Sequence, residues 1–324
     1  MKTFTLVKRK AQINLKVIYS VLLSLAIFCL LVAMVAQPQV YMNQALNALI
    51  VWATVLLPSL FPFILYTKFL SSLGMIEPIS KLFSNVTSKL YNVSGISSFV
   101  YLMSIMSGYP VGAKLTTDLY MEGKINRGEA QRIVTFCANC GPMFLVGTVG
   151  VGLLANKTAG YIMLVSHLLG ALLNGLIFRK YKLNDQTTLP QKNTSSTNED
   201  VLSKNVISSA NSMFVVGAYV VIFFVLIQFL NTILPINQSS TFGALFNGFF
   251  EITHGCKDIA NLALASNWKI ILCCFVASFG GLATAMQSIT FLKKLNMKFS
   301  FFLLFKLTHA ILSTVICALF CLIF

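Results

Sequence analysis

Long apolar runs, separated by short gaps that carry basic residues, are the feature that most limits how this chain can fold. Of its 324 residues, 56% are hydrophobic and only 10% are charged. A soluble globule of this length exposes more polar surface than such a composition can supply. The sequence therefore predicts an integral membrane protein. The apolar runs lie near residues 17–36, 45–73, 99–113, 130–155, 159–178, 206–234, 242–265, 270–292 and 300–324.

The basic residues give the chain a net charge of +15. They are not gathered in one domain or interleaved with aromatic residues, as they are in proteins that bind nucleic acid. They occupy the gaps between apolar runs instead, where the determinants of membrane topology lie. We therefore expect the lipid bilayer, and no nucleic acid, as a partner.

The first apolar run, residues 17–36, has two interpretations, a signal peptide or a retained span. At about 20 residues it is longer than the apolar part of a signal peptide. Residues 37–39 offer no small-residue cleavage site. We predict a retained first span, preceded by a basic leader that contains Lys2, Lys8, Arg9, Lys10 and Lys16.

Loop charges favour a re-entrant segment at 99–113 over a simple span. Basic residues flank it on both sides, among them Lys89 and Lys124, and positive loops face the cytoplasm. The segment would then enter and leave the membrane on the same face. A tilted helix that continues to Glu122 is the alternative.

The predicted fold is an all-α polytopic membrane protein of about eight membrane helices plus re-entrant or broken segments. Residues 184–205 form a polar tract and are interpreted as a cytoplasmic linker between two membrane halves. The predicted division is a leader and first span at 1–44, a first half at 45–183, the linker at 184–205 and a second half at 206–324.

Loosely matched positions in the two halves favour an inverted repeat. His167 lines up with His309, each inside an apolar run. Gly108 lines up with Gly280, but Gly141 can be matched to Gly280 instead. The sequence leaves the phase of the repeat open.

The first candidate site is the sequence SGYPVGAKLTTD at 107–118. Its glycines free the backbone and Pro110 lacks an N–H donor, so a helix has to stop there. A new helix from Ala113 onward would direct its N-terminal amides, together with Lys114, at an anion. The alternative is a proline kink in which Lys114 pairs with Asp118. We predict a broken segment at a transport site, because irregular backbone in hydrocarbon needs protein or a polar cavity around it.

The sequence FCANCGP predicts a second break inside the membrane. Asn126 is expected to cap a helix, with a glutamate at its third position, that runs to Cys137. Asn139, Gly141 and Pro142 then end it, and the Asn139 amide would offer a donor and an acceptor to a solute. The Cys-x-x-Cys spacing stands alone, so no metal site is predicted.

The sequence EITHGCKD places Glu251 and His254 three residues apart. On one helical face, this pair is suited to proton coupling near neutral pH. The alternative is an interfacial helix end with solvated charges. A second glycine break, at Gly280 and Gly281, leads to Gln287, and its alternative is close helix packing through small residues.

No catalytic or nucleotide-binding motif occurs in the sequence, so we expect no enzyme activity and no cofactor. His167 and His309 stand alone in apolar runs. We interpret them as hydrogen-bonded structural residues rather than a proton relay.

The string SGYPVGAKLTTDLYMEGKINRGEAQRIVTFCANCGP, followed by VGTVGVGLL and SHLLGALLNGLIF, resembles the YlbJ (SpoVV) family of sporulation integral membrane proteins. EITHG and SFGGLATAMQS extend the resemblance into the second half. It implies paired Gate domains, the nucleoside-recognition module also associated with concentrative nucleoside transporters and ferrous-iron transporters. The chain departs from the family in its short length and in Cys140, where a small polar residue is expected.

The resemblance implies a protein of the outer forespore membrane that helps to carry dipicolinate, a small planar dianion. Transport of a small anionic solute is thus the expected function. The alternatives are a nucleoside-type or other small-solute permease and a non-transporting structural protein of sporulation. A homo-oligomer or other sporulation membrane proteins are expected partners. The breaks and the resemblance together predict a substrate site and gate at Ser107, Gly108, Tyr109, Pro110, Gly112, Lys114, Asn139, Gly141, Pro142, Gly280, Gly281 and Gln287.

Overall fold

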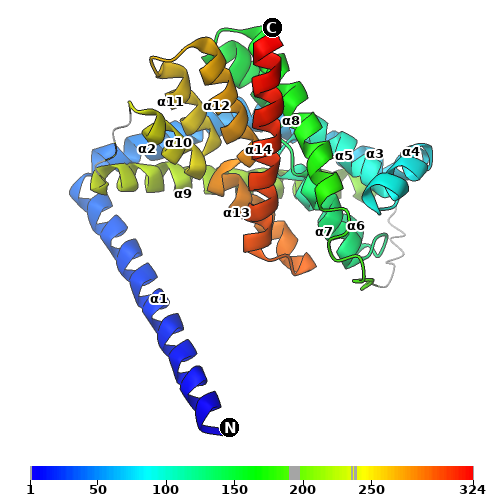
Figure 1. Cartoon of the computed structure of the whole chain (residues 1–324), viewed down its shortest axis with the longest axis horizontal. Helices are drawn as coiled ribbons and strands as arrows, with labels where there is room; N and C mark the ends of the chain where they lie inside the picture. The colour runs from blue at the N-terminus through cyan, green and yellow to red at the C-terminus, as the bar shows by residue number, and fades with distance from the viewer. Residues whose placement is uncertain (1, 190–197, 235, 237–238, 324) are drawn as a thin grey trace.

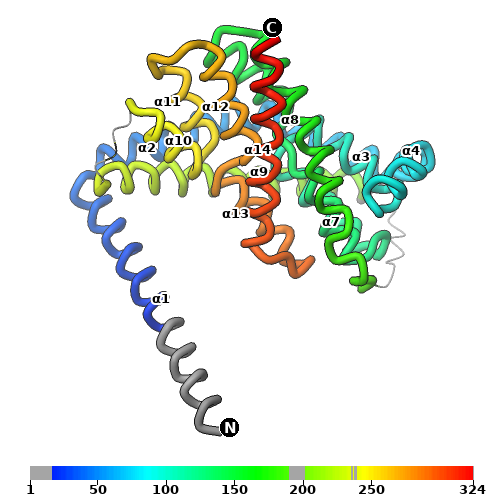
Figure 2. The backbone as a smooth tube through the Cα atoms, in the orientation of Figure 1, coloured from blue at the N-terminus to red at the C-terminus, as the bar shows by residue number. Residues whose placement is uncertain are grey.

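The chain folds almost entirely into helices that are interrupted by short breaks (Figures 1 and 2). The computed structural model describes the backbone of residues 2–189, 198–234, 236 and 239–323, and the side chains of the same residues except 2–16 and 198–200. The α-helices are α1 (Lys2–Ala36), α2 (Pro38–Val51), α3 (Leu57–Ser72), α4 (Ile76–Tyr91), α5 (Ile96–Ser107), α6 (Val111–Met121), α7 (Arg127–Cys137), α8 (Lys157–Ile177), α9 (Asn198–Ile233), α10 (Thr241–Phe250), α11 (Ile252–Asn261), α12 (Ser266–Phe279), α13 (Gly281–Leu292) and α14 (Phe299–Ile323). Two π-helical segments, η1 (Trp52–Leu56) and η2 (Met143–Leu153), and one 3-10 helix, η3 (Lys293–Leu295), complete the described elements.

Six helical segments of the described chain are long and apolar enough to cross a membrane. Shorter apolar helices, α5 and η2, add to them. The predicted all-α polytopic fold class is confirmed. The six segments are Val17–Ala36, Pro38–Ser72, Lys157–Ile177, Val201–Ile233, Ser266–Leu295 and Phe299–Ile323.

Helix α1 stands apart from the rest of the molecule (Figure 1). From Val17 onward its large apolar side chains are exposed, as at Tyr19 and Phe28. A helix that is apolar on all sides is suited to a lipid environment. The predicted first span, residues 17–36, thus forms one apolar helix of spanning length.

Two long helical segments pair antiparallel and cross the rest of the fold. The first consists of α2, η1 and α3, and the second is α9. Near one end of the pair Gln44 donates to Gln228 (3.1 Å), and near the other Asn205 donates to Ser72 (3.1 Å). In Figure 1 this crossed pair runs across the upright helices α8 and α14.

Apart from α4 and η3, the remaining helices of the described chain occur twice in the same order. A hairpin (α5 and α6), a broken helix (α7 and η2) and an unbroken helix (α8) make up the first half. The second half repeats them as α10 and α11, α12 and α13, and α14. The broken helices are interrupted near Gly141 and at Gly280. This order favours matching Gly141, rather than Gly108, to Gly280.

The two halves are inverted relative to each other, because α8 and α14 pack antiparallel. Asn174, near the end of α8, donates to the carbonyl of Phe305 near the start of α14 (3.0 Å). About two turns nearer the start of α8, the ring centroids of His167 and His309 lie 4.6 Å apart. The two histidines that the sequence matched are therefore neighbours.

The first hairpin begins and ends at the same end of the molecule. Ser94, just before α5, donates its backbone N–H to the carboxylate of Glu129 (2.7 Å), which lies in the first turn of α7. The chain therefore returns to its starting end after the tip at Tyr109. This is the re-entrant geometry predicted for 99–113, and no continuous helix to Glu122 forms.

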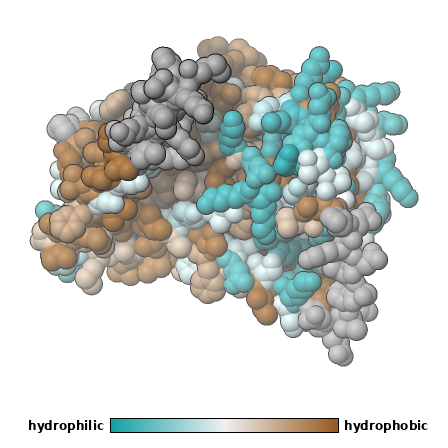
Figure 3. Space-filling view, turned by 90° about the horizontal axis from the view of Figure 1, so that it is seen from below, coloured by the Kyte–Doolittle hydropathy of each residue, from teal (hydrophilic) through white to brown (hydrophobic). Residues whose placement is uncertain are grey.

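Three basic segments meet at that end, which we call the basic end. Arg127 in α7 forms an ion pair with Asp185 beyond α8 (2.8 Å). Gln131 donates to the carbonyl of Leu295 in η3 (2.7 Å). The view from below shows hydrophilic side chains gathered on one part of this face (Figure 3). The exposed lysines of these segments include Lys124, Lys180, Lys182, Lys293, Lys294 and Lys298.

Two helix starts can be compared with the predicted boundaries. Helix α7 runs from Arg127 to Cys137 as predicted, and Asn126 caps it by accepting from the backbone N–H of Glu129 (2.8 Å). Helix α9 begins at Asn198, inside the predicted linker 184–205, so the described part of the linker is shorter than expected. Residues 190–197 of that linker lie outside the described residues.

Candidate solute-binding site

Breaks from both halves meet in the middle of the molecule. In the first half, the hairpin tip lies against the broken helix: a Cβ atom added to Gly108 would lie 2.8 Å from the amide nitrogen of Gly141. In the second half, a Cβ added to Gly281 would lie 3.1 Å from the carbonyl oxygen of Phe250. Each tip therefore packs on the break of its own half, and only glycine allows the approach.

The two halves also contact each other at these breaks. The Tyr109 hydroxyl, from the first tip, donates to the carbonyl of Ser278 just before the break in α12 and α13 (3.2 Å). A Cβ added to Gly280 would lie 3.3 Å from the same hydroxyl oxygen. Gly108 and Gly280 have φ angles of +72° and +87°, which favour glycine. The predicted helix breaks are present, and the fold brings them together.

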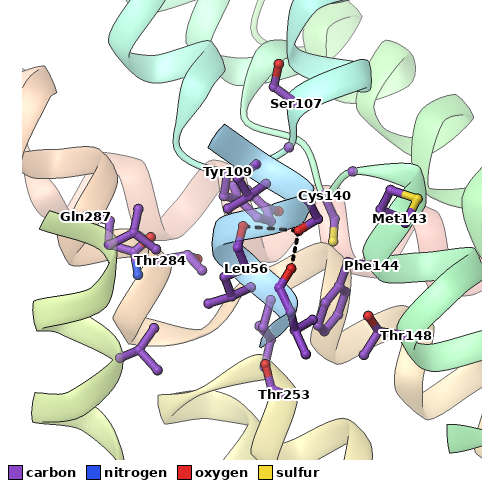
Figure 4. A pocket seen from close by; sticks show the side chains of 18 of the residues that line it. Leu56, Ser107, Tyr109, Cys140, Met143, Phe144, Thr148, Thr253, Thr284 and Gln287 are labelled. Carbon is purple, nitrogen blue, oxygen red and sulfur yellow. Dashed lines mark hydrogen bonds between the residues drawn. The ribbon is translucent and has the colours of Figure 1, made fainter. Parts of the chain in front are cut away.

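A partly enclosed cavity lies between these breaks and the crossed pair of long helices (Figure 4). About 60 Å³ of it can hold the centre of a water molecule, which is several times what one water needs. The long helices supply an apolar wall that includes Leu56, Leu60, Val216 and Val220. The breaks and the helices that start from them supply a more polar wall that includes Ser107, Tyr109, Cys140, Glu251, Thr284 and Gln287.

Five of the predicted site residues line this cavity, namely Ser107, Gly108, Tyr109, Gly141 and Gln287. Figure 4 shows Gln287 and Thr284 on one side and Cys140, Met143 and Phe144 on the other. Gln287 is only 3% exposed. Within the described residues its side-chain amide has no hydrogen-bond partner, so it can offer both a donor and an acceptor to a solute.

Lys114 lies away from this cavity. Its ammonium pairs with Asp118 at 2.9 Å, one helical turn on, which is the contact expected for the alternative interpretation of this segment. Lys114, Pro110 and Lys68 line a second, smaller cavity. The role predicted for Lys114 at the substrate site stays a prediction.

The remaining predicted residues shape the breaks without lining the cavity. Asn139 is buried, and its amide donates to the hydroxyl of Ser104 (3.2 Å). Its side-chain oxygen has no partner among the described atoms. Gly112 packs directly on the carbonyl of Cys137. Pro142 precedes the first residue of η2.

Glu251 and His254 are arranged differently from the predicted pair on one helical face. Glu251 has an extended backbone at the second tip and caps α11, accepting from the backbone N–H of His254 (2.8 Å). Its side chain is buried and reaches the cavity wall. The His254 ring packs edge-on against Phe224 of α9 (5.5 Å between centroids). A joint proton-coupling role for the two stays a prediction.

Lys306 of α14 is a buried cation that the sequence reasoning passed over. It is 1% exposed. Its ammonium donates to the hydroxyl of Tyr109 and to the carbonyl of Ala138 (2.9 Å). Nδ1 of His309 lies 3.3 Å away as a third acceptor. No ion pair of the described residues includes Lys306, so its contacts are with neutral groups.

The two histidines hold this network in place. The backbone N–H of Cys140 donates to Nε2 of His167 (2.8 Å), so Nδ1 carries the proton that bonds the Ser278 hydroxyl (2.8 Å). Nε2 of His309 in turn bonds the carbonyl of His167 (3.0 Å). That bond leaves Nδ1 of His309 free to accept from Lys306. These contacts agree with the interpretation of both histidines as hydrogen-bonded structural residues.

Lys306 had a signal in the sequence. It is the one lysine of the apolar run 300–324 and lies three residues before His309. An ionisable residue inside a membrane segment marks a functional site by default. The contacts that it makes with Tyr109 and Ala138 bridge more than 160 residues, as separations of 197 and 168 show, and local patterns do not reveal them.

No family model matches the sequence, and no solved structure matches it. Among curated proteins, the chain is 27% identical to the sporulation integral membrane protein YlbJ of Bacillus subtilis (strain 168). The alignment extends over 337 positions and covers 93% of this chain and 83% of the relative. This similarity makes the chain a relative of the YlbJ protein. Because the alignment covers nearly the whole chain, the similarity to YlbJ includes most of both halves.

Proposed function

We propose that this relative of YlbJ carries a small anionic solute across the membrane through the cavity at the helix breaks. The observation that carries the proposal is a water-accessible cavity lined by the breaks of two inverted halves. In hydrocarbon, irregular backbone of this kind is tolerated around such a cavity. In transporters built from inverted repeats, the solute site lies where the repeats meet.

The N-terminal part of α13 beside the cavity supports an anion as the solute. Helix α13, whose Thr284 and Gln287 line the cavity, begins at Gly281 without a side chain that caps its first N–H groups. Such N-termini present free donors and a partial positive charge. Gln287, in the second turn of α13, adds an amide that has no partner within the described structure. An anionic solute would satisfy these donors.

Dipicolinate is the substrate that we propose, with transport across the outer forespore membrane. The similarity to a sporulation protein supports this role. A planar aromatic dianion suits a cavity with one apolar wall and one polar wall, because its ring and its carboxylates need different surroundings. A neutral nucleoside is the second candidate, since the amide of Gln287 and the hydroxyl of Ser107 could bind its polar groups without a charge.

Uptake by the purified full chain in liposomes tests the proposal. We expect saturable accumulation of radiolabelled dipicolinate that unlabelled dipicolinate inhibits. Substituting Gln287→Ala should lower uptake roughly tenfold, because a hydrogen bond to a charged group contributes about 1.5 kcal/mol or more. Gln186→Ala is the matched control, since Gln186 is exposed and bonds Asn126 at the basic end.

The outcomes separate the candidates. Accumulation of uridine without dipicolinate would select the nucleoside permease. Accumulation of neither solute would contradict a transporter and favour the structural role. Equal uptake by the Gln287→Ala and Gln186→Ala variants would contradict the proposal that the solute passes through the central cavity.

A further inference from the structure

Lys306 lies one side chain behind the wall of the central cavity. Tyr109 lines the cavity, whereas Lys306 does not. The ammonium sits 4.6 Å from the centroid of the Tyr109 ring and donates to its hydroxyl. Ala138, which accepts from the same ammonium, is two residues from the lining residue Cys140. Moving the Tyr109 ring would therefore open a direct path from the cavity to the ammonium.

The architecture does not need a lysine at this position. When His167 is matched to His309, the residue three places earlier is Leu164 in α8 and Lys306 in α14. Leu164 packs against the main hydrophobic core. The same helix position is thus filled by an apolar residue in one half and by a cation in the other. Burial of an ion removes hydration that is worth several kcal/mol, so the lysine requires a reason other than packing.

The surroundings of Lys306 provide acceptors but no negative charge. Its described partners are a phenol hydroxyl, a peptide carbonyl and an imidazole nitrogen, and none of these three groups is an anion. The ion pairs of the described residues all lie elsewhere, at Lys114, Lys124 and Arg127. A carboxylate brought in from the cavity would supply the missing countercharge.

We propose that Lys306 is the cation that binds the solute's carboxylate, and that Tyr109 covers it until the anion enters. The inference rests on the proposed function and names the charged group of that same site. A carboxylate oxygen would replace the Tyr109 hydroxyl as one of the three acceptors. Ala138 and His309 would keep the other two, so the ammonium changes a single hydrogen bond and gains a charged partner.

The position of Tyr109 means that entry of the anion would change contacts in both halves. Its hydroxyl bonds the carbonyl of Ser278 and rests on Gly280, both in the second half. Tyr109 itself belongs to the tip of the first hairpin. Displacing this ring breaks a direct contact between the first tip and the second break. Binding at Lys306 is thereby linked to the contact that holds the two halves together.

Binding by the detergent-purified full chain tests the inference. Equilibrium dialysis would compare dipicolinate with its uncharged dimethyl ester. We expect the wild type to prefer the dianion, and Lys306→Met to weaken dianion binding at least tenfold while leaving ester binding within about twofold. Lys306→Gln, which keeps N–H donors without the charge, should lose the same preference. Tyr109→Phe should keep it, because the ring and the ammonium both remain.

Lys269→Met is the matched control, because it removes the same charge from an ammonium that donates to the carbonyl of Ala260 and does not line the cavity. Elution volume and helical circular dichroism establish that each variant is folded. Unchanged preference for the dianion in Lys306→Gln would overturn the inference while leaving the proposed function intact. Wild-type binding without uptake into liposomes would overturn the proposed function alone. A wild type that binds no dianion would overturn both.

Discussion

Gly112 shows how a single hydrogen atom in place of a side chain allows the first hairpin to close. A Cβ added here would overlap the carbonyl of Cys137 and lie 2.9 Å from the Cβ of Ser104. The first obstacle is backbone at a helix end and cannot rotate away. We expect Gly112→Ala to destabilise the protein by about 1–3 kcal/mol, measured as a lower midpoint of thermal unfolding in detergent.

Gly147→Ala is the control for this prediction. Its added Cβ would meet nothing nearer than the end of the Met143 side chain at 3.9 Å, which is an ordinary contact. Its unfolding midpoint should therefore stay close to that of the wild type. Equal midpoints for the two alanine variants would show that the tip and the broken helix do not pack as described.

Two lysines illustrate what residue patterns can and cannot predict. The spacing of Lys114 and Asp118 allows a pair within one helix, and that local pair forms. The contact between Lys306 and Tyr109 depends on where two distant breaks come to lie. Local spacing therefore predicted the pair that Lys114 forms with Asp118. It could not predict the contacts of Lys306, because these follow from the assembly of both halves.

At the scale of elements, a polar joint holds the start of α7 to the segment after α8. Arg127 donates to both carboxylate oxygens of Asp185, at 2.8 and 3.1 Å. The backbone N–H of Gly128 donates to the carbonyl of the same aspartate (3.0 Å), and the Thr187 hydroxyl donates to its side chain (2.8 Å). This joint ties the end of the first hairpin to the end of the first half.

The joint makes a prediction about pH. The hydrogen bond from Arg127 lowers the pKa of Asp185 below its usual value of 3.8. A carboxyl group with a lowered pKa stabilises the fold above its unfolded pKa and loses that contribution as the pH falls through its folded pKa. We expect the unfolding midpoint of the wild type to exceed that of Asp185→Asn by a constant amount above about pH 5, and the difference to shrink below pH 3.8.

Arg127→Gln provides the check on the cause. Asp185→Asn is introduced both into the wild type and into Arg127→Gln. Without the guanidinium, the pH-dependent part of the change in unfolding midpoint that Asp185→Asn causes should largely disappear. The side chains of Arg127 and Asp185 are 28% and 14% exposed, so solvent screens the pair and the shift in midpoint should be small. A difference that is the same at every pH from acid to neutral would contradict the assignment.

The elements were predictable to the extent that their signals are local. The cap at Asn126, the helix that it starts and the breaks at glycine and proline follow from short-range geometry, and they are present. The phase of the repeat was not predictable, because Gly108 and Gly141 are both glycines at predicted breaks and either could match Gly280. Only the order of helices shows that Gly141 matches Gly280. The start of α9 was placed too late because polar residues can extend a helix beyond its apolar part.

At the scale of the whole molecule, the inverted halves place their hairpins at opposite ends. The first hairpin opens at the basic end, as the bond from Ser94 to Glu129 shows. The second hairpin leads into the start of α12, where Asn267 donates to the carbonyl of Cys321 near the end of α14 (3.0 Å). The two tips then meet midway, and the cavity lies where they meet.

This arrangement predicts the orientation of the chain in the membrane. Exposed lysines crowd the basic end, whereas the opposite end, beside Asn156 and Asn267, carries few charges. Positive loops face the cytoplasm, so the linker after α8 should be cytoplasmic and the end of α14 should lie on the other side. Alkaline phosphatase, which is active only outside the cytoplasm, should be active when fused after α14 and inactive when inserted into residues 190–197. Green fluorescent protein at the same two positions should give the opposite pattern. Since α14 is one unbroken helix of 25 residues, its two ends cannot share a side if it spans the bilayer, and phosphatase activity at both positions would contradict the inverted architecture.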